Sequence, residues 1–243
     1  MTADGVVDSC RLWKLDEIVD WIRPRAKNDC LVAIDAPLII ENESHQRPCE
    51  KTISQCFGPY EAGAHSSNRS MPSFKSGGRA NELAKQLNLD TNPHFDPGSL
   101  GRRAIEVYPH PALVALFGLP VSLKYKGGRH RTPETRRPEF ATLTRLMESL
   151  STHTPPAIDV RQSSRWADLK RRISDAPSGA ALDRAEDELD AYVCAYVALY
   201  YWTHGLDRCR VVGDVATGYI VTPVSDAHAA CLDRACEEVL PGD

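Results

Sequence analysis

The chain has 243 residues, of which 42% are hydrophobic, and a formal net charge of -4 at pH 7. This length and apolar content are sufficient for one substantial core. The charge excludes a global attraction to nucleic acid or anionic membrane, so any such binding needs a local basic patch. The longest apolar run, residues 191–202, is shorter than the ~20 residues of a membrane-spanning helix.

Eight cysteines are spread along the chain without a CxxC pair. The first residues also lack the basic stretch and apolar core that mark a secretory signal. In a chain of this size, the two observations favour free thiols over a disulfide framework. We therefore expect a cytoplasmic protein with reduced cysteines and no membrane association.

Apolar spacing divides the chain into alternating helices and strands. Residues 15–22 place apolar side chains at helical spacing, and residues 31–40 are almost wholly apolar, as in a strand covered on both faces. Residues 41–100 are polar and rich in turn formers, which predicts an insertion of helix and loop that partly covers a site. The pattern then predicts a strand in 103–111, helices in 112–118 and 138–150, a long helix over 181–205 and closing strands in 209–223. This alternation predicts a single α/β domain over residues 1–243.

Asp35 lies inside the apolar stretch LVAIDAPLII, where an unpaired carboxylate is costly. Pro37 lacks an amide proton and favours an extended backbone at Ala36, so strand pairing is predicted to stop just after Asp35. Asp35 would then lie at the carboxyl end of a strand, which is the edge where open α/β sheets bind ligands. A local turn cap is the alternative interpretation of this aspartate.

Two further acids lie in similarly apolar surroundings. Glu106 falls within the second predicted strand, and Asp190 precedes the part of the long helix that is almost wholly apolar. Carboxylates from two strands and a helix suit Mg²⁺ or Mn²⁺, and paired ions ~4 Å apart activate water in phosphodiester hydrolysis. We therefore predict Asp35, Glu106 and Asp190 as metal ligands. The neighbouring Glu186 and Asp187 near the helix start would complement the helix dipole equally well without any further function.

Residues 124–137, KYKGGRHRTPETRR, form a loop with six Lys and Arg residues against a single Glu. Phosphate is the natural partner of such a loop. We predict that Lys124, Lys126 and Arg129 contact the backbone of a nucleic acid and that Tyr125 stacks on a base. A solvated basic loop without a ligand is the alternative.

Six spaced motifs connect these features: AIDAPL, RPCE, AIEVYPHPAL, LKYKGGR, DELDAYVCAYVA and GYIVTP. In this order, over roughly residues 15–224, they resemble the domain of unknown function 429 family, whose members are predicted nucleases with a ribonuclease H-like fold. The resemblance implies a mixed sheet flanked by helices. It also implies a catalytic centre in which Asp35 and Glu106 are the strand acids and Asp187 and Asp190 are the helix acids.

The same resemblance assigns a role to Arg47 and predicts one departure. Arg47 matches the R-x-C-[DE] element of the family, where an arginine contacts phosphate or braces the site, and an ion pair at a helix start is an equal alternative. Ribonuclease H folds begin with a strand that carries an aspartate, and no such motif precedes Asp35. We expect a late start or a lost ligand, with self-association to cover the exposed sheet.

Three functions follow from these expectations. The first is a nuclease that depends on Mg²⁺ or Mn²⁺ and uses water as its nucleophile. The second is a non-catalytic relative that binds nucleic acid, a nucleotide or a protein partner. The third, a kinase or chaperone with the same sheet topology, would need a glycine-rich phosphate loop, and we find none in the sequence.

Overall fold

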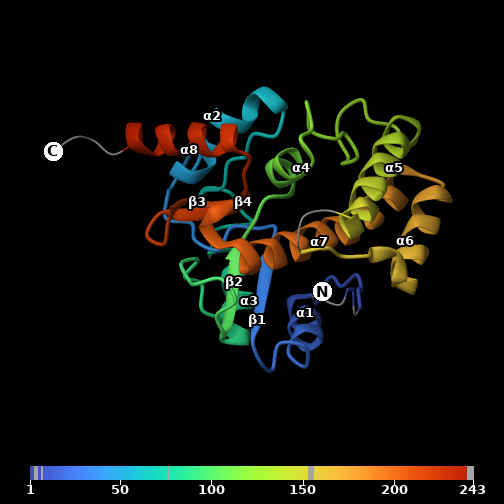
Figure 1. Cartoon of the computed structure of the whole chain (residues 1–243), viewed down its shortest axis with the longest axis horizontal. Helices are drawn as coiled ribbons and strands as arrows, with labels where there is room; N and C mark the ends of the chain where they lie inside the picture. The colour runs from blue at the N-terminus through green and yellow to red at the C-terminus, as the bar shows by residue number, and fades with distance from the viewer. Residues whose placement is uncertain (3–4, 7, 76, 153–155, 240–243) are drawn as a thin grey trace.

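The protein has a mixed α/β architecture, as the sequence predicts (Figure 1). The computed structural model describes residues 1–2, 5–6, 8–75, 77–152 and 156–239. Within them lie the helices α1 (Leu15–Ile22), α2 (Pro48–Phe57), α3 (Gly78–Leu87), α4 (Pro109–Phe117), α5 (Pro133–Ser149), α6 (Ser164–Ser174), α7 (Gly179–His204) and α8 (Asp226–Val239), and the short 3-10 helices η1 (Gly58–Tyr60), η2 (Leu150–Thr152), η3 (Val160–Gln162) and η4 (Gly205–Asp207).

The strands form two pairs. β1 (Cys30–Ile34) and β2 (Arg102–Glu106) run parallel, and β3 (Cys209–Asp214) and β4 (Gly218–Pro223) form an antiparallel hairpin. A parallel bridge between Val107 and Val221 joins the pairs, so that β2 lies between β1 and β4.

The register of β1 and β2 determines where the predicted acids lie. Ile34, the last residue of β1, is paired with Glu106, and its carbonyl oxygen accepts a hydrogen bond from Val107 N at 3.0 Å. Asp35 therefore follows β1 directly, where the proline-based prediction places it. Successive side chains along a strand point to opposite faces, so Asp35 and Glu106 are directed away from each other.

The long helix α7 links the sheet to the other helices. It begins where the Ser178 side chain accepts a hydrogen bond from Ala181 N, and it ends at Gly205, whose φ of 52° suits a residue without a Cβ atom. Its apolar residues pack against β1 and β4, and its amino-terminal half packs against α6 and α5 (Figure 1). No described helix, α7 included, combines the length and apolar character needed to cross a membrane.

Several elements differ from the sequence-based expectations. The strand predicted at 103–111 ends at Glu106, and the helix after it begins at Pro109, which suits a first helical turn. The helix predicted at 138–150 begins earlier, at Pro133, because Thr132 caps it and proline is well tolerated in a first turn. The predicted insertion contains α2, which has Pro48 in its first turn and which the sequence indicated only through the alternative of a helix-start ion pair at Arg47. α6 was also missed, because its region reads as mixed and basic.

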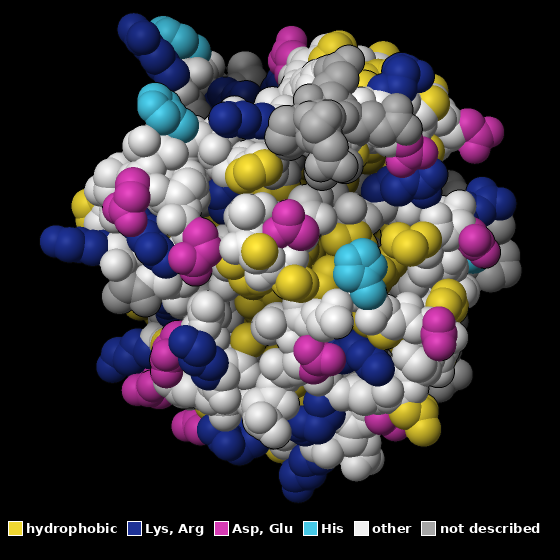
Figure 2. All heavy atoms as spheres, turned by 90° about the vertical axis from the view of Figure 1, so that its left-hand side faces the viewer, with side chains coloured by type: hydrophobic (Ala, Val, Ile, Leu, Met, Phe, Trp, Pro, Cys, Tyr) yellow, Lys and Arg dark blue, Asp and Glu magenta, His cyan; other side chains and the backbone are white. Residues whose placement is uncertain are grey.

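A second apolar cluster lies where α8 packs against α2. Cys56 of α2 and Cys231 of α8 form a disulfide, and His228 stacks on Phe57 with ring centroids 4.6 Å apart. The expectation that all cysteines are reduced is therefore wrong for this pair. Figure 2 shows the end of the molecule that carries α8: apolar side chains gather near its centre, with acidic and basic side chains interspersed around them.

The disulfide joins two cysteines that are 175 positions apart in the sequence. It should stabilise the fold because it restricts the conformations of the unfolded chain. We predict that Cys231→Ser lowers the free energy of unfolding by about 2–4 kcal/mol. Urea denaturation followed by circular dichroism measures this change. Cys236→Ser, at an exposed free cysteine of the same helix, is the matched control. Reductant should lower the stability of the parent to that of Cys231→Ser, and an unaffected parent would contradict the assignment.

Candidate functional site

Lys126 joins two of the predicted acids at the carboxyl end of β1. Its Nζ lies 2.7 Å from Oδ2 of Asp190 on α7 and 3.6 Å from Oδ2 of Asp35. Tyr125 Oη donates to the other oxygen, Oδ1, of Asp190 at 2.6 Å. The structure thus brings together two carboxylates that are far apart in sequence, with one ammonium group between them. We call this group, Asp35, Lys126 and Asp190, the lysine-bridged acidic pair.

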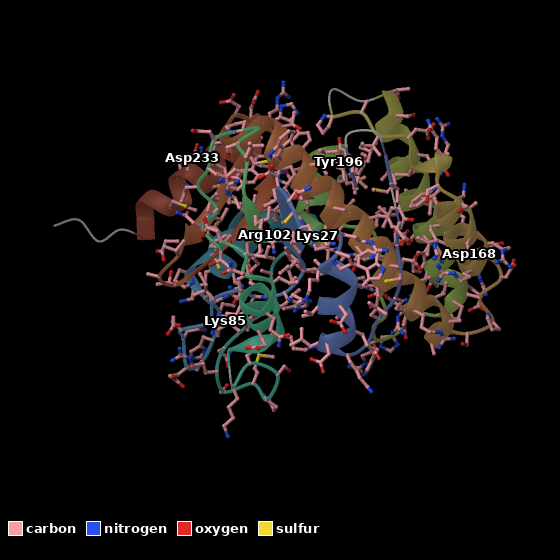
Figure 3. The ribbon with its side chains drawn as sticks, turned by 90° about the horizontal axis from the view of Figure 1, so that it is seen from below. Lys27, Lys85, Arg102, Asp168, Tyr196 and Asp233 are labelled. Atoms are coloured by element: carbon pink, nitrogen blue, oxygen red, sulfur yellow. A yellow bond between two sulfur atoms is a disulfide. The ribbon has the colours of Figure 1, made fainter. Side chains whose placement is uncertain are left out.

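The two carboxylates differ in their contact with solvent. The Asp35 side chain is 33% exposed and the Asp190 side chain 11% exposed. Figure 3 looks at the other end of these strands, where Lys27 and Arg102 line a hollow near the amino ends of β1 and β2. The lysine-bridged acidic pair lies instead at the carboxyl end, where ligands bind in open α/β sheets.

Burial and charge shift the pKa of each member of the pair. Burial raises the pKa of Asp35 to about 6, although Lys126 lowers it, and burial likewise raises the pKa of Asp190. Burial lowers the pKa of Lys126, but the charges of Asp190 and Asp35 outweigh this effect and raise it above its ordinary value. The ammonium therefore remains charged at neutral pH and favours the ionised form of both acids.

Arg136 and Glu186 together fix the backbone on the two sides of Lys126. The guanidinium Nε of Arg136 donates to the carbonyl oxygen of Tyr125 at 2.7 Å, and its Nη atoms pair with Asp183 at 2.8 Å and Glu186 at 2.9 Å. Gly127 N also donates to Glu186 at 3.0 Å. The Arg136 side chain is only 2% exposed. Sequence reasoning placed Arg136 in the basic loop, and the signal it missed was the Thr-Pro pair that starts α5.

Glu106 lies outside the lysine-bridged acidic pair, contrary to expectation. Its Oε1 and Oε2 accept hydrogen bonds from Arg47 at 2.5 and 3.0 Å, and its Oε2 also accepts from Leu38 N at 2.9 Å. Arg47 pairs in addition with Glu50 at 2.9 Å, and all three ionic side chains are buried. Burial lowers the pKa of Arg47, but its bonds to Glu106 outweigh this and raise it. Glu106 therefore secures the start of α2 to the sheet.

The predicted metal-ligand set is consequently not assembled. Among the described residues, no group of three or more His, Cys, Asp or Glu side chains is arranged to hold a metal ion. Asp35 and Asp190 remain together, whereas Glu106 belongs to the ion pair with Arg47. Asp187, the other predicted helix acid, lies at the surface and pairs with Arg11 at 2.9 Å.

The residues predicted to contact nucleic acid have divergent environments. Tyr125 is completely buried, so it cannot stack on a base, and Arg47 is buried beside its two glutamates, away from any phosphate. Lys124 is half-buried and pairs with Glu61 at 2.6 Å, while Arg129 is exposed. Of this set, Lys124, Lys126 and Arg129 keep access to solvent.

His110 is a neighbour of the site that sequence reasoning overlooked. Its Nδ1 lies 2.8 Å from Ser122 Oγ, and its ring centroid lies 5.8 Å from that of Tyr125. Burial lowers the pKa of His110 to about 3, and the nearby Lys126 contributes in the same direction. The imidazole is therefore neutral at physiological pH. The only signal in the sequence was its position at the carboxyl end of the second predicted strand, between Pro109 and Pro111.

Comparison with known proteins places the chain in a family. A family model described as protein of unknown function (DUF429) matches residues 2–217. The chain belongs to the DUF429 family. In the same comparison, no curated protein and no solved structure matches the chain. The DUF429 match includes the lysine-bridged acidic pair and the Arg47–Glu106 ion pair, and it ends before β4 and α8.

Loss of the buried Arg47–Glu106 ion pair should have a large effect on the stability of this DUF429 protein. Glu106→Gln would leave Arg47 buried with only Glu50 as its counter-ion, so we expect the free energy of unfolding to fall by about 3 kcal/mol or more. Urea denaturation measures it. Glu61→Gln, which breaks the exposed pair with Lys124, is the matched control and should change stability little. Equal effects of the two substitutions would contradict a structural role for Glu106.

For Asp35, in contrast to Glu106, we expect that removing the charge makes the folded protein more stable at higher pH. Its pKa rises from 3.8 to about 6 on folding, so the unfolded chain loses its proton first and the parent loses stability as the pH rises from about 4 to 6. Asp35→Asn removes the ionisable carboxyl and with it this pH-dependent loss of stability. With a chelator present, we expect the variant to gain on the parent across that interval, measured by urea denaturation at each pH. A parent that gains stability relative to the variant as the pH rises would identify Asp35 as a structural carboxylate.

Proposed function

We propose that this DUF429 protein is a nuclease that depends on Mg²⁺ or Mn²⁺ and hydrolyses phosphodiester bonds in nucleic acid. The observation that supports this most directly is the lysine-bridged acidic pair, in which Asp35 and Asp190 converge on one positive charge at the carboxyl end of a strand. Paired carboxylates are unfavourable in a protein unless a cation balances them.

The donor set suits a single divalent ion. Mg²⁺ is commonly bound through one or two carboxylates, with water and substrate phosphate as its other ligands. The Lys126 ammonium already acts as a stand-in cation between Asp35 and Asp190, and Glu106 is held by Arg47. The proposal therefore assigns the ion to Asp35 and Asp190 alone. When bound, such an ion stabilises charge on the phosphoryl oxygens and generates a nucleophilic water at neutral pH.

Other residues would bind and orient the substrate. Tyr125 holds Asp190 in place through its hydroxyl group, and the exposed Arg129 extends from the same loop, where it would attract phosphate. A ribonuclease H-like arrangement and a cytoplasmic location belong to this proposal. Its support is the central β2 strand flanked by β1 and β4, with α7 packed against the sheet and carrying Asp190.

A second candidate is a non-catalytic module that binds nucleic acid, a nucleotide or a protein partner. Two observations favour it: the third predicted acid, Glu106, is unavailable, and Lys126 already neutralises part of the charge of the remaining two. Under this proposal, Lys126 and Arg129 contact phosphate, and the two aspartates hold Lys126 in position.

A cleavage assay distinguishes the two candidates. Labelled single- and double-stranded DNA and RNA are incubated with the protein in Mg²⁺, Mn²⁺ or chelator. We expect cleavage only with a divalent ion, and a loss on the order of 100-fold or more in Asp35→Asn and in Asp190→Asn. Asp187→Asn, at an exposed acid of the same helix, is the control and should retain activity.

The controls make each outcome interpretable. Circular dichroism establishes that every variant is folded. Cleavage that persists in chelator, or that Asp187→Asn abolishes as fully as Asp190→Asn, would contradict the proposed site. Binding to the oligonucleotides by a folded parent, without cleavage in either metal, would favour the non-catalytic module.

A further inference from the structure

We propose that Lys126 is the resident cation of the Asp35–Asp190 pair and that a divalent ion enters the site by displacing it. The inference rests on the cation site of the proposed function and specifies how that site is regulated. In the free protein, the lysine occupies the place that the ion would take. Binding of the ion then requires the ammonium group to move to another anion, and the phosphate of a nucleic acid is such a group.

The contacts around Asp190 leave little room for a second cation. Oδ2 of Asp190 faces Lys126 Nζ at 2.7 Å, and Oδ1 accepts the Tyr125 hydroxyl at 2.6 Å. Asp35 contributes its Oδ2 to the same ammonium at 3.6 Å. Within the part of the chain that the structure describes, no other cation forms an ion pair with either aspartate. An incoming divalent ion would meet a positive charge at close range, which opposes its binding.

The backbone permits the side chain to leave without unfolding the loop. Arg136 holds the carbonyl oxygen of Tyr125, and Glu186 holds Gly127 N, so the residues on either side of Lys126 are fixed. The Lys126 side chain itself is 21% exposed. Rotation about the bonds of its four-carbon chain can therefore move the ammonium toward solvent while the loop backbone stays in place.

This arrangement couples the two ligands of the site. A divalent ion binds weakly while the ammonium remains between the carboxylates. A phosphate that attracts Lys126 releases Asp35 and Asp190, so phosphate and the ion each favour binding of the other. The aspartates would then hold a metal ion mainly when a substrate is present.

Isothermal titration calorimetry with MnCl₂, without nucleic acid, tests the displacement. We expect Lys126→Met to bind Mn²⁺ on the order of tenfold or more tightly than the parent, because the competing charge is gone. Lys124→Met is the matched control: it removes the same charge from the same loop, but Lys124 pairs with Glu61 and not with the aspartates. This control should bind Mn²⁺ like the parent. Asp35→Asn in the Lys126→Met background should abolish the gain.

Lys126→Gln and circular dichroism guard against a misfolded variant, and the rise in melting temperature with Mn²⁺ gives a second readout. Equal or weaker binding of Mn²⁺ by folded Lys126→Met and Lys126→Gln, including no binding by any variant, would overturn the inference. A similar gain in Lys124→Met would also overturn it, because the effect would then be one of net charge. Tighter Mn²⁺ binding without any cleavage of nucleic acid would support the inference and count against the nuclease alone.

Discussion

The parallel register of β1 and β2 is the constraint on which the arrangement of charged residues depends. It pairs Ile34 with Glu106, so Asp35 is one residue out of phase with the glutamate. Side chains alternate along a strand, and the two acids are therefore directed to opposite faces. Asp35 meets Lys126 and approaches α7, whereas Glu106 meets Arg47 at the start of α2. A shift by one residue would exchange their surroundings.

Two acids in similar sequence contexts thus have different physical roles. Glu106 is buried and bonded to the guanidinium of Arg47, which joins α2 to the sheet. This part of the predicted insertion, residues 41–100, is therefore attached to the sheet and does not simply cover a site. Asp35 retains access to solvent and shares the partly exposed Lys126 side chain with Asp190. A rigid buried pair on one face can hold the strand ends in place, while the partly hydrated pair on the other face remains free to exchange its cation.

Local sequence was sufficient for the features that depend on local chemistry. The apolar run and Pro37 located Asp35 at the end of a strand, and the apolar half of α7 located Asp190. It failed where a distant partner decides the outcome. Glu106 is captured by Arg47, 59 residues away, and Cys56 by Cys231, 175 residues away.

The basic loop shows a second kind of failure, because its amino-acid composition is that of a solvated segment. Its polar appearance hid the buried Tyr125 and the buried Arg136, which are both committed to internal hydrogen bonds. Charge counting treats every basic residue as available to phosphate. The contacts leave a smaller set of available basic residues, and they distinguish Lys126, which pairs with two aspartates, from the exposed Arg129.

Lys126 also explains why the same geometry supports two proposed functions. As long as the ammonium stays between Asp35 and Asp190, the site carries a fixed positive charge suited to binding an anion. Once the ammonium leaves, two carboxylates remain that suit a divalent ion. The difference between a binding module and a nuclease is then the free energy needed to move one side chain. That free energy depends on the anion offered to the lysine outside the site, so a phosphate-rich ligand would itself favour the catalytic arrangement.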